Sequence, residues 1–133
     1  MTHPPYYCRQ RVTCADGFSI SIQAHEGAYC TPRKGNAKAY EEVELGFPSE
    51  PDDLITPFAE CFMGTGLTET VYPYTNAAIV HKLIAKHGGM ISGELPPLTG
   101  EPIPVIPVTI AVEFPIILKT RTPFTYNEII INQ

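Results

Sequence analysis

The chain has 133 residues, enough for one domain, and its 9 basic and 14 acidic side chains give a net charge of −5. With 44% hydrophobic residues it is too apolar to be disordered throughout, and its acidic balance argues against a general DNA- or RNA-binding protein. It contains no run of about 18 apolar residues, so we expect no membrane span, and its first ten residues lack the apolar core of a secretory signal.

Residues 1–10 predict an extended arm, because Pro4 and Pro5 cannot begin a strand ladder. Residues 11–24 predict a β-hairpin. Asp16 and Gly17 are a strong two-residue turn signal, since glycine tolerates a positive φ. On both sides of this turn apolar residues alternate with polar ones, which is the period of a strand with one buried face. The apolar members are Val12, Cys14, Phe18, Ile20 and Ile22.

A loop is predicted over residues 25–39, where three of the basic residues lie. Residues 40–47 predict a strand, with Tyr40, Glu42 and Glu44 on one face and Val43 and Leu45 on the other. Prolines then punctuate the chain, and we expect short turns near residues 52–55 and 58–62. Residues 70–74 predict another short strand.

A single helix is predicted over residues 76–87. Thr75 or Asn76 can cap its start, and Gly88 follows as the left-handed residue that ends many helices. Its apolar side chains form one stripe, consisting of Ile79, Val80, Leu83 and Ile84. A short strand is expected at residues 90–95.

From residue 96 onward the composition changes, because this last segment holds half of the 14 prolines. Prolines exclude a helix and confine strands to sheet edges. Residues 108–114 predict one proline-free strand, and residues 116–122 and 124–131 predict two more. We expect this apolar arm to lie against a sheet edge or groove of a neighbouring subunit or, alternatively, of its own domain. Its candidate assembly residues are Val108, Ile110, Val112, Phe114, Ile116, Leu118, Phe124 and Ile129.

These elements predict an α+β fold: a small, mostly antiparallel sheet, one main helix and an extended proline-rich C-terminal β arm. The expected organisation is an N-terminal arm (1–10), a core domain (11–95) and a tail (96–133). We expect the core to contain Val12, Phe18, Ile20, Ile22, Val43, Leu45, Ile79, Val80, Leu83 and Ile84.

Five short motifs follow one another between Cys14 and Gly89: CADGF, YCTPR, VELGFPS, VYPY and HGG. In this pattern the core, over about residues 11–89, resembles a group of small uncharacterised proteins encoded by tailed bacteriophages. The resemblance implies a phage origin but no particular activity, and it does not extend into the proline-rich tail.

The loop 25–39 is the first candidate site. Arg33, Lys34 and Lys38 lie between Tyr29 and Tyr40, and cationic groups beside aromatic rings suit a phosphate with a stacked base. The sequence therefore suggests a bound nucleotide or short single strand. The alternative is a charged loop that serves solubility alone.

The cysteines are expected to be reduced thiols, because the chain is not dense in cysteine and no export signal is visible; no C-x-x-C pair occurs either. Cys14, His25 and Cys30 could hold zinc together with Cys8 or Cys61, but their spacing is unlike that of zinc ligands, and buried thiols are the favoured interpretation. A cysteine–histidine nucleophile lacks a sequence signal for an oriented base or an oxyanion hole. We therefore predict no metal, no cofactor and no enzymatic activity.

Half of the acidic residues fall between Glu41 and Glu60. Glu42 and Glu44 share a strand face and could form an acid pair or bind a cation. A solvated acidic face is the simpler interpretation, and such a face favours a basic partner.

Two hypotheses for function remain. The first is a non-enzymatic phage protein that acts by assembly, most simply a structural or accessory, decoration-type component of the virion. Its C-terminal arm would contact further copies of itself or other particle proteins. The alternative is a host-directed, anti-defence inhibitor that binds a nucleotide signal or a host protein. Both predict a location in the virion or the host cytoplasm, without membrane attachment or general nucleic-acid binding.

Overall fold

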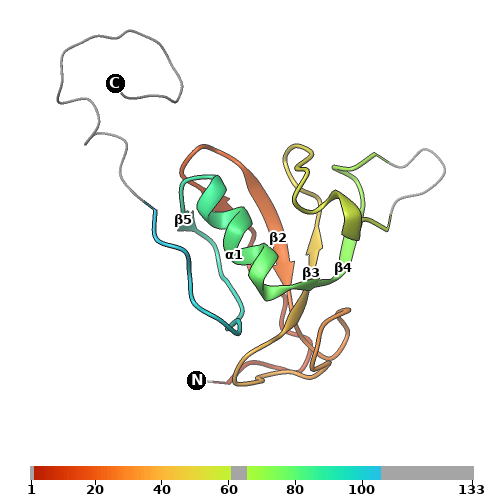
Figure 1. The fold of residues 1–133 in the computed structure, drawn as a ribbon. Coiled ribbons are helices and arrows are strands. Elements are labelled where there is room, and N and C mark those ends of the chain that lie inside the picture. The colour runs from red at the N-terminus through yellow and green to blue at the C-terminus, as the bar shows by residue number, and fades with distance from the viewer. Residues whose placement is uncertain (1, 61–65, 106–133) are drawn as a thin grey trace, which may run out of the picture.

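The computed structural model describes residues 2–60 and 66–105. Its elements are β1 (Val12–Cys14), β2 (Ser19–Gln23), β3 (Glu42–Gly46), the 3₁₀ turn η1 (Thr56–Phe58), β4 (Val71–Asn76), the helix α1 (Ala77–Lys86) and β5 (Met90–Ser92). Within these residues the strands form one five-stranded sheet in the order β4-β3-β2-β1-β5, and every pairing is antiparallel. The helix α1 lies across one face of this sheet (Figure 1). The predicted α+β class, with a small antiparallel sheet and one helix, is confirmed.

The hairpin of β1 and β2 forms where its sequence predicts, but its turn holds three residues, 15–17, rather than two, because the N–H of Cys14 donates to the carbonyl of Phe18 at 2.8 Å. Val12 pairs with Ile20 across the two strands, and Gly17 adopts a φ of 97° in the turn. The turn is closed by the side chain of Asp16, whose Oδ1 accepts the backbone N–H of Phe18 at 2.9 Å. Along β2, buried and partly exposed residues alternate, so one face of the hairpin is committed to the core.

The helix α1 has the ends that its sequence predicts. The Oδ1 of Asn76 caps its start by accepting the N–H of Ile79 at 2.9 Å. Gly88, with a φ of 90°, follows the last turn and reverses the chain toward β5. The side chains of Val80 and Leu83 are buried in the core, while Ile79 and Ile84 pack at its margin.

The core contains most of the expected residues. Eight of them are buried, and these are Val12, Phe18, Ile20, Ile22, Val43, Leu45, Val80 and Leu83. Three large side chains that were not expected there are fully buried as well: Tyr40, Ile55 and Tyr72.

The placement of Tyr40 on a polar strand face with Glu42 and Glu44 is wrong. The strand β3 begins only at Glu42, so the alternation does not reach back to Tyr40. The backbone of Tyr40 instead pairs with the segment after β5, because its N–H donates to the carbonyl of Pro97 at 2.8 Å and its own carbonyl accepts from Thr99 at 3.1 Å. This pairing turns the Tyr40 ring into the core.

Both chain ends of the described region pack on the domain. In the N-terminal arm, the Tyr7 hydroxyl donates to Glu94 at 2.6 Å, and the backbone N–H of Arg9 donates to the side chain of Gln23 at 2.7 Å. After β5, which is shorter than expected, the chain returns beside α1 (Figure 1). There the Nε2–H of His81 donates to the carbonyl of Thr99 at 3.0 Å. The strands predicted at 108–114, 116–122 and 124–131 lie outside the described residues.

Candidate functional site

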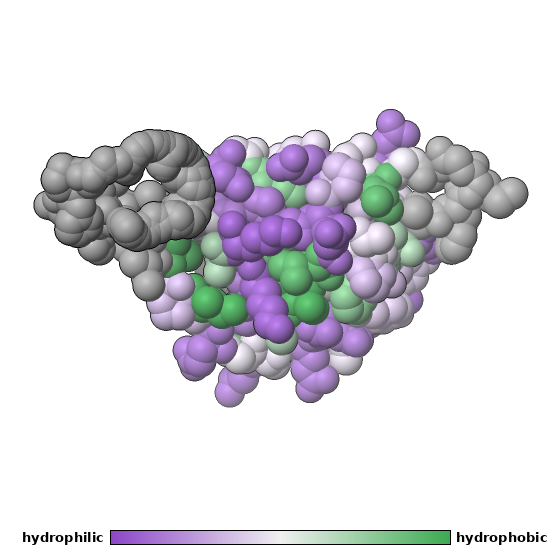
Figure 2. Space-filling model, turned by 45° about the horizontal axis from the view of Figure 1, so that its top comes forward, coloured by the Kyte–Doolittle hydropathy of each residue, from purple (hydrophilic) through white to green (hydrophobic). Residues whose placement is uncertain are grey.

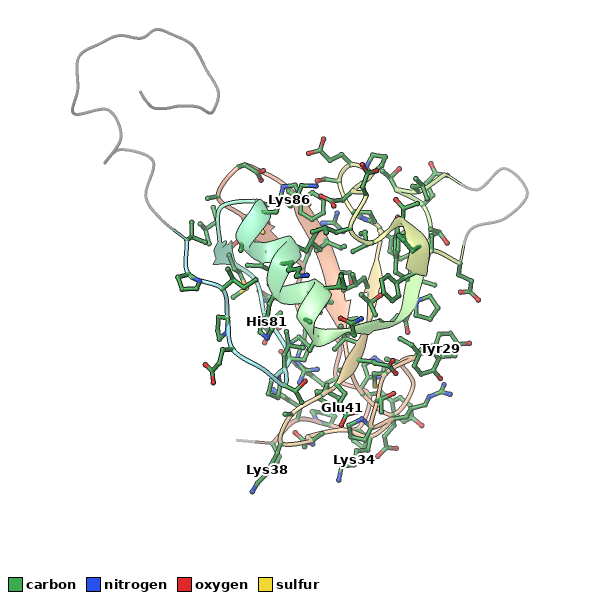
Figure 3. All side chains as sticks on the ribbon, viewed as in Figure 1. Tyr29, Lys34, Lys38, Glu41, His81 and Lys86 are labelled. Atoms are coloured by element: carbon green, nitrogen blue, oxygen red, sulfur yellow. The ribbon has the colours of Figure 1, made fainter. Side chains whose placement is uncertain are left out.

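The loop residues predicted to bind a nucleotide do not come together at one point. Tyr29 is 40% exposed, and the guanidinium of Arg33 lies 5.0 Å from its ring centroid. Lys34 and Lys38 extend from one end of the domain, away from Tyr29 at its side (Figure 3). Tyr40 is buried, and its hydroxyl donates to the carbonyl of Lys34 at 2.7 Å, so its ring has no face free for a ligand.

A residue that sequence reasoning missed, Tyr74, completes an aromatic surface with Tyr29. Its ring is 42% exposed, and the two ring centroids lie 5.8 Å apart with their planes tilted by 41°. The backbone joins them too, because the N–H of Tyr74 donates to the carbonyl of Tyr29 at 3.1 Å. We call Tyr29, Tyr74 and Arg33 the tyrosine platform.

The tyrosine platform exists because the alternation of β4 breaks at Pro73. Simple alternation would place Tyr74 on the same face as the buried Tyr72. The register between β3 and β4 shifts between Val43 and Leu45, and Tyr74 adopts a φ of 50°. The ring of Tyr74 therefore turns to solvent. The proline inside the VYPY motif is the one sequence signal that could have indicated this irregularity.

Carboxylates lie beside the tyrosine platform. Glu44 accepts the backbone N–H of Tyr29 at 2.8 Å, and Glu42 accepts the Thr31 hydroxyl at 2.7 Å. In the part of the chain that the structure describes, Arg33 forms no ion pair, so its charge remains available to a partner. The local charge balance is therefore unfavourable for a polyphosphate and suits a ligand that is neutral or carries one acidic group.

A second cluster, also missed from the sequence, surrounds His87. Its Nδ1 lies 2.7 Å from Asp16 Oδ2 and its Nε2 lies 2.7 Å from Asp52 Oδ2, while its ring stacks on Phe18 at a centroid distance of 3.9 Å. Lys86 adds a hydrogen bond to Asp52 at 3.1 Å. We call Asp16, Asp52, Lys86 and His87 the histidine cluster.

The two carboxyl groups of the histidine cluster are held ionised. Burial alone would raise the pKa of Asp52, but hydrogen bonds from His87, from the Leu54 N–H and from Lys86 outweigh it, and the pKa is lowered. The pKa of Asp16 is likewise lowered, because hydrogen bonds from the Phe18 N–H and from His87 outweigh the effect of burial. Ionised carboxylates only accept hydrogen bonds, and the two carboxylates hold the His87 ring between them.

The histidine cluster is therefore a structural tie and not a catalytic pair. Each ring nitrogen of His87 lies 2.7 Å from a carboxylate oxygen, so neither is free to contact a substrate. The cluster joins the hairpin turn at Asp16, the turn at Asp52 and the C-terminal end of α1, where the positive charge of Lys86 suits the helix dipole. Its member Lys86 lies at the opposite end of the domain from Lys34 and Lys38 (Figure 3).

A shallow cavity of about 240 Å³ lies between α1 and the segment that follows β5. It is lined by Ala78, His81, Lys82, Thr99, Gly100, Glu101 and Ile103. The Nε2–H of His81 is already bonded to the carbonyl of Thr99.

The described cysteines are free thiols. Cys14 and Cys30 are buried, and burial raises the pKa of both, which disfavours the reactive thiolate. The Sγ of Cys30 donates to the carbonyl of His25 at 3.4 Å. Residues 2–60 and 66–105 contain no cluster of histidine, cysteine, aspartate or glutamate that could hold a metal ion, so the proposed set of Cys14, His25 and Cys30 does not form one there. Cys61 lies outside the described residues.

Comparison with known proteins finds no family model, no curated protein and no solved structure that matches this chain. Among the described residues, no helix has the length and apolar character needed to cross a membrane.

Proposed function

We propose that this chain is a non-enzymatic assembly protein of a tailed bacteriophage, a structural or accessory component of the particle that contacts its neighbours through its C-terminal arm. The observation that carries the proposal is the apolar surface where that arm begins. Met90 and Ile91 on the edge strand β5 are 40% and 67% exposed, and Ile103 and Val105 are 42% and 44% exposed.

These four side chains come from two segments that meet at the β5 edge of the sheet. Val105 lies against Gly89, directly before β5, so the last described residues return to the edge strand. Figure 2 shows apolar surface close to the point at which the grey trace begins. A sheet edge with exposed apolar side chains is a ready partner for another strand. The sequence beyond residue 105 supplies alternating apolar residues suited to that role.

The histidine cluster and the buried thiols of Cys14 and Cys30 favour an assembly function over an enzymatic one. Both nitrogens of the one histidine held between carboxylates are occupied, and the two buried thiols have raised pKa values. The alternative, a host-directed inhibitor, is favoured by one observation, the exposed contact of Arg33 with Tyr29. Its nucleotide version requires a phosphate close to Glu42 and Glu44, which would repel it.

Substitutions in the arm of the full-length chain test the proposal. In V112E/F114E, two charges replace apolar residues on one face of the strand that the sequence predicts at 108–114, and we expect the assembled species to dissociate to the 14.6 kDa chain. The matched control T109E/A111E adds the same charge on the other face of that predicted strand. Sedimentation velocity would measure both variants. Equal assembly of V112E/F114E and the wild type would contradict the proposal.

A further inference from the structure

The tyrosine platform is held in place at the expense of backbone strain. A φ of 50° is unfavourable for a bulky residue such as Tyr74. Here the strained residue does not fill the core. Its ring is turned to solvent beside Tyr29, and the hydrogen bond from its N–H to the Tyr29 carbonyl fixes the two together. The fold therefore presents a rigid aromatic surface.

The shape and charge of this surface indicate the kind of ligand. Adjoining exposed aromatic rings bind proline-rich segments in the extended polyproline conformation, which needs little further ordering. The two rings, tilted by 41°, form a shallow face for such a segment. Glu42 and Glu44 disfavour a polyanion, and Arg33 offers one positive charge at the edge.

The chain itself contains a proline-rich, uncharged segment of the kind that such a surface binds. Residues 102–107 read PIPVIP, contain no charged side chain and follow directly after Glu101. Pro104 and Pro107 are three residues apart, one turn of a polyproline helix or roughly 9 Å, so both prolines lie on the same edge of such a helix. Residues 102–105 are exposed, which leaves them accessible.

We propose that the tyrosine platform of one chain binds the proline-spaced segment 102–107 of a second copy of this chain, with Glu101 of that copy facing Arg33. The inference rests on the proposed assembly function and deepens it, because it names the surface that receives the beginning of the arm. Contact between two different surfaces is head-to-tail, so repeated copies form a ring or a chain.

The sheet order places the described residues 102–105 far from the platform of their own chain. Tyr74 lies on β4 and Val105 lies against Gly89 beside β5, at the two opposite edges of the five-stranded sheet. Four strand spacings separate these edges, roughly 19 Å. Figure 3 likewise shows Tyr29 on the side of the domain away from the segment 101–105. Residues 102–105 would have to leave their described position to reach the platform of their own chain.

Tyr74→Gly tests the acceptor without endangering the fold, because glycine relieves the positive φ while it removes the ring. Phe47→Gly is a matched control, since Phe47 is 49% exposed, also has a φ of 50° and lies beyond the other end of the β3–β4 pair. In the full-length chain, we expect Tyr74→Gly to raise the dissociation constant of self-association at least about tenfold. Phe47→Gly should leave it unchanged.

A mixing experiment identifies the two sides of the contact. The full-length variant P102A/P104A/P107A keeps the platform, and Tyr74→Gly keeps the proline segment. We expect each to sediment as a monomer alone and the equimolar mixture to give a species of twice the 14.6 kDa chain mass.

The outcomes separate this inference from the proposed function. If Tyr74→Gly assembles as the wild type does while V112E/F114E is monomeric, the assembly function stands and the platform is not its acceptor. If the mixture stays monomeric, the head-to-tail contact is refuted. If ATP binds the wild type but not Tyr74→Gly, and assembly is the same in both, the platform is a nucleotide site and the inference is wrong.

Discussion

Replacement of Asp52 by asparagine should destabilise the fold strongly. Asp52 is 5% exposed and accepts hydrogen bonds from His87 at 2.7 Å, from the Leu54 N–H at 2.9 Å and from Lys86 at 3.1 Å. Asparagine keeps the shape but removes the charge on which these hydrogen bonds depend, and a hydrogen bond to a charged group contributes about 1.5–3 kcal/mol. Because Lys86 is half exposed and Asp16 still pairs with His87, we expect a total loss of about 3 kcal/mol.

The assay is thermal and urea unfolding of Asp52→Asn beside Asp53→Asn, a matched control at the adjacent, exposed aspartate. At pH 7 the melting temperature of Asp52→Asn should fall by roughly 12 °C, and that of the control should hardly change. A difference between the two variants of less than about 0.5 kcal/mol would refute the role given to the histidine cluster.

The pH dependence adds a second check on the same residue. The pKa of Asp52 is lowered in the folded state from its ordinary value of 3.8, so its contribution to stability is complete above that pH. The contribution is lost as the pH falls through the folded-state pKa, because the wild-type carboxyl is then protonated too. The stability advantage of the wild type over Asp52→Asn should therefore shrink below about pH 3.8. An advantage that grows on acidification would contradict the sign of this linkage.

Three further substitutions or reactions test other parts of the fold. Gly93→Ala should lower the free energy of unfolding by more than about 2 kcal/mol, because a Cβ there would clash with the backbone oxygen of Arg11, just before β1. Gly17→Ala is its control, since Gly17 has a similar φ but open space around it. We expect Gly17→Ala to cost only about 1 kcal/mol in the same urea titration. Asn76→Ala removes the cap of α1 and should lower the free energy of unfolding by about 1 kcal/mol, measurable by circular dichroism. In the native protein a thiol reagent should label Cys8 much faster than the buried Cys30, as peptide mass mapping would show; equal rates would contradict the described burial.

Local patterns predicted the elements that depend on local physics. The turn at Asp16 and Gly17 and the cap at Asn76 each involve residues at most three positions apart, and both form where expected, although the turn is one residue longer than predicted. The alternation along β2 predicted its buried face for the same reason. These features allowed the hairpin, the helix and most of the core to be predicted from the sequence.

Local sequence patterns could not predict the features that depend on contacts between residues far apart in the chain. Tyr40 is buried because its backbone pairs with Pro97 and Thr99, and no periodicity near Tyr40 encodes that contact. The histidine cluster joins residues 35 and 71 positions apart, so its members looked like unrelated turn and helix-end residues. Tyr74 was missed because a register shift in the sheet overrides the alternation of its strand.

The solution mass of the purified full-length chain, determined by light scattering at two concentrations, tests the assembly function most directly. We predict a species several times heavier than the 14.6 kDa chain. Its mass should be the same at both concentrations if the copies close into a ring, and should rise with concentration if they form an open chain. A mass of 14.6 kDa at both concentrations would contradict self-assembly through the C-terminal arm and, with it, the head-to-tail contact at the tyrosine platform.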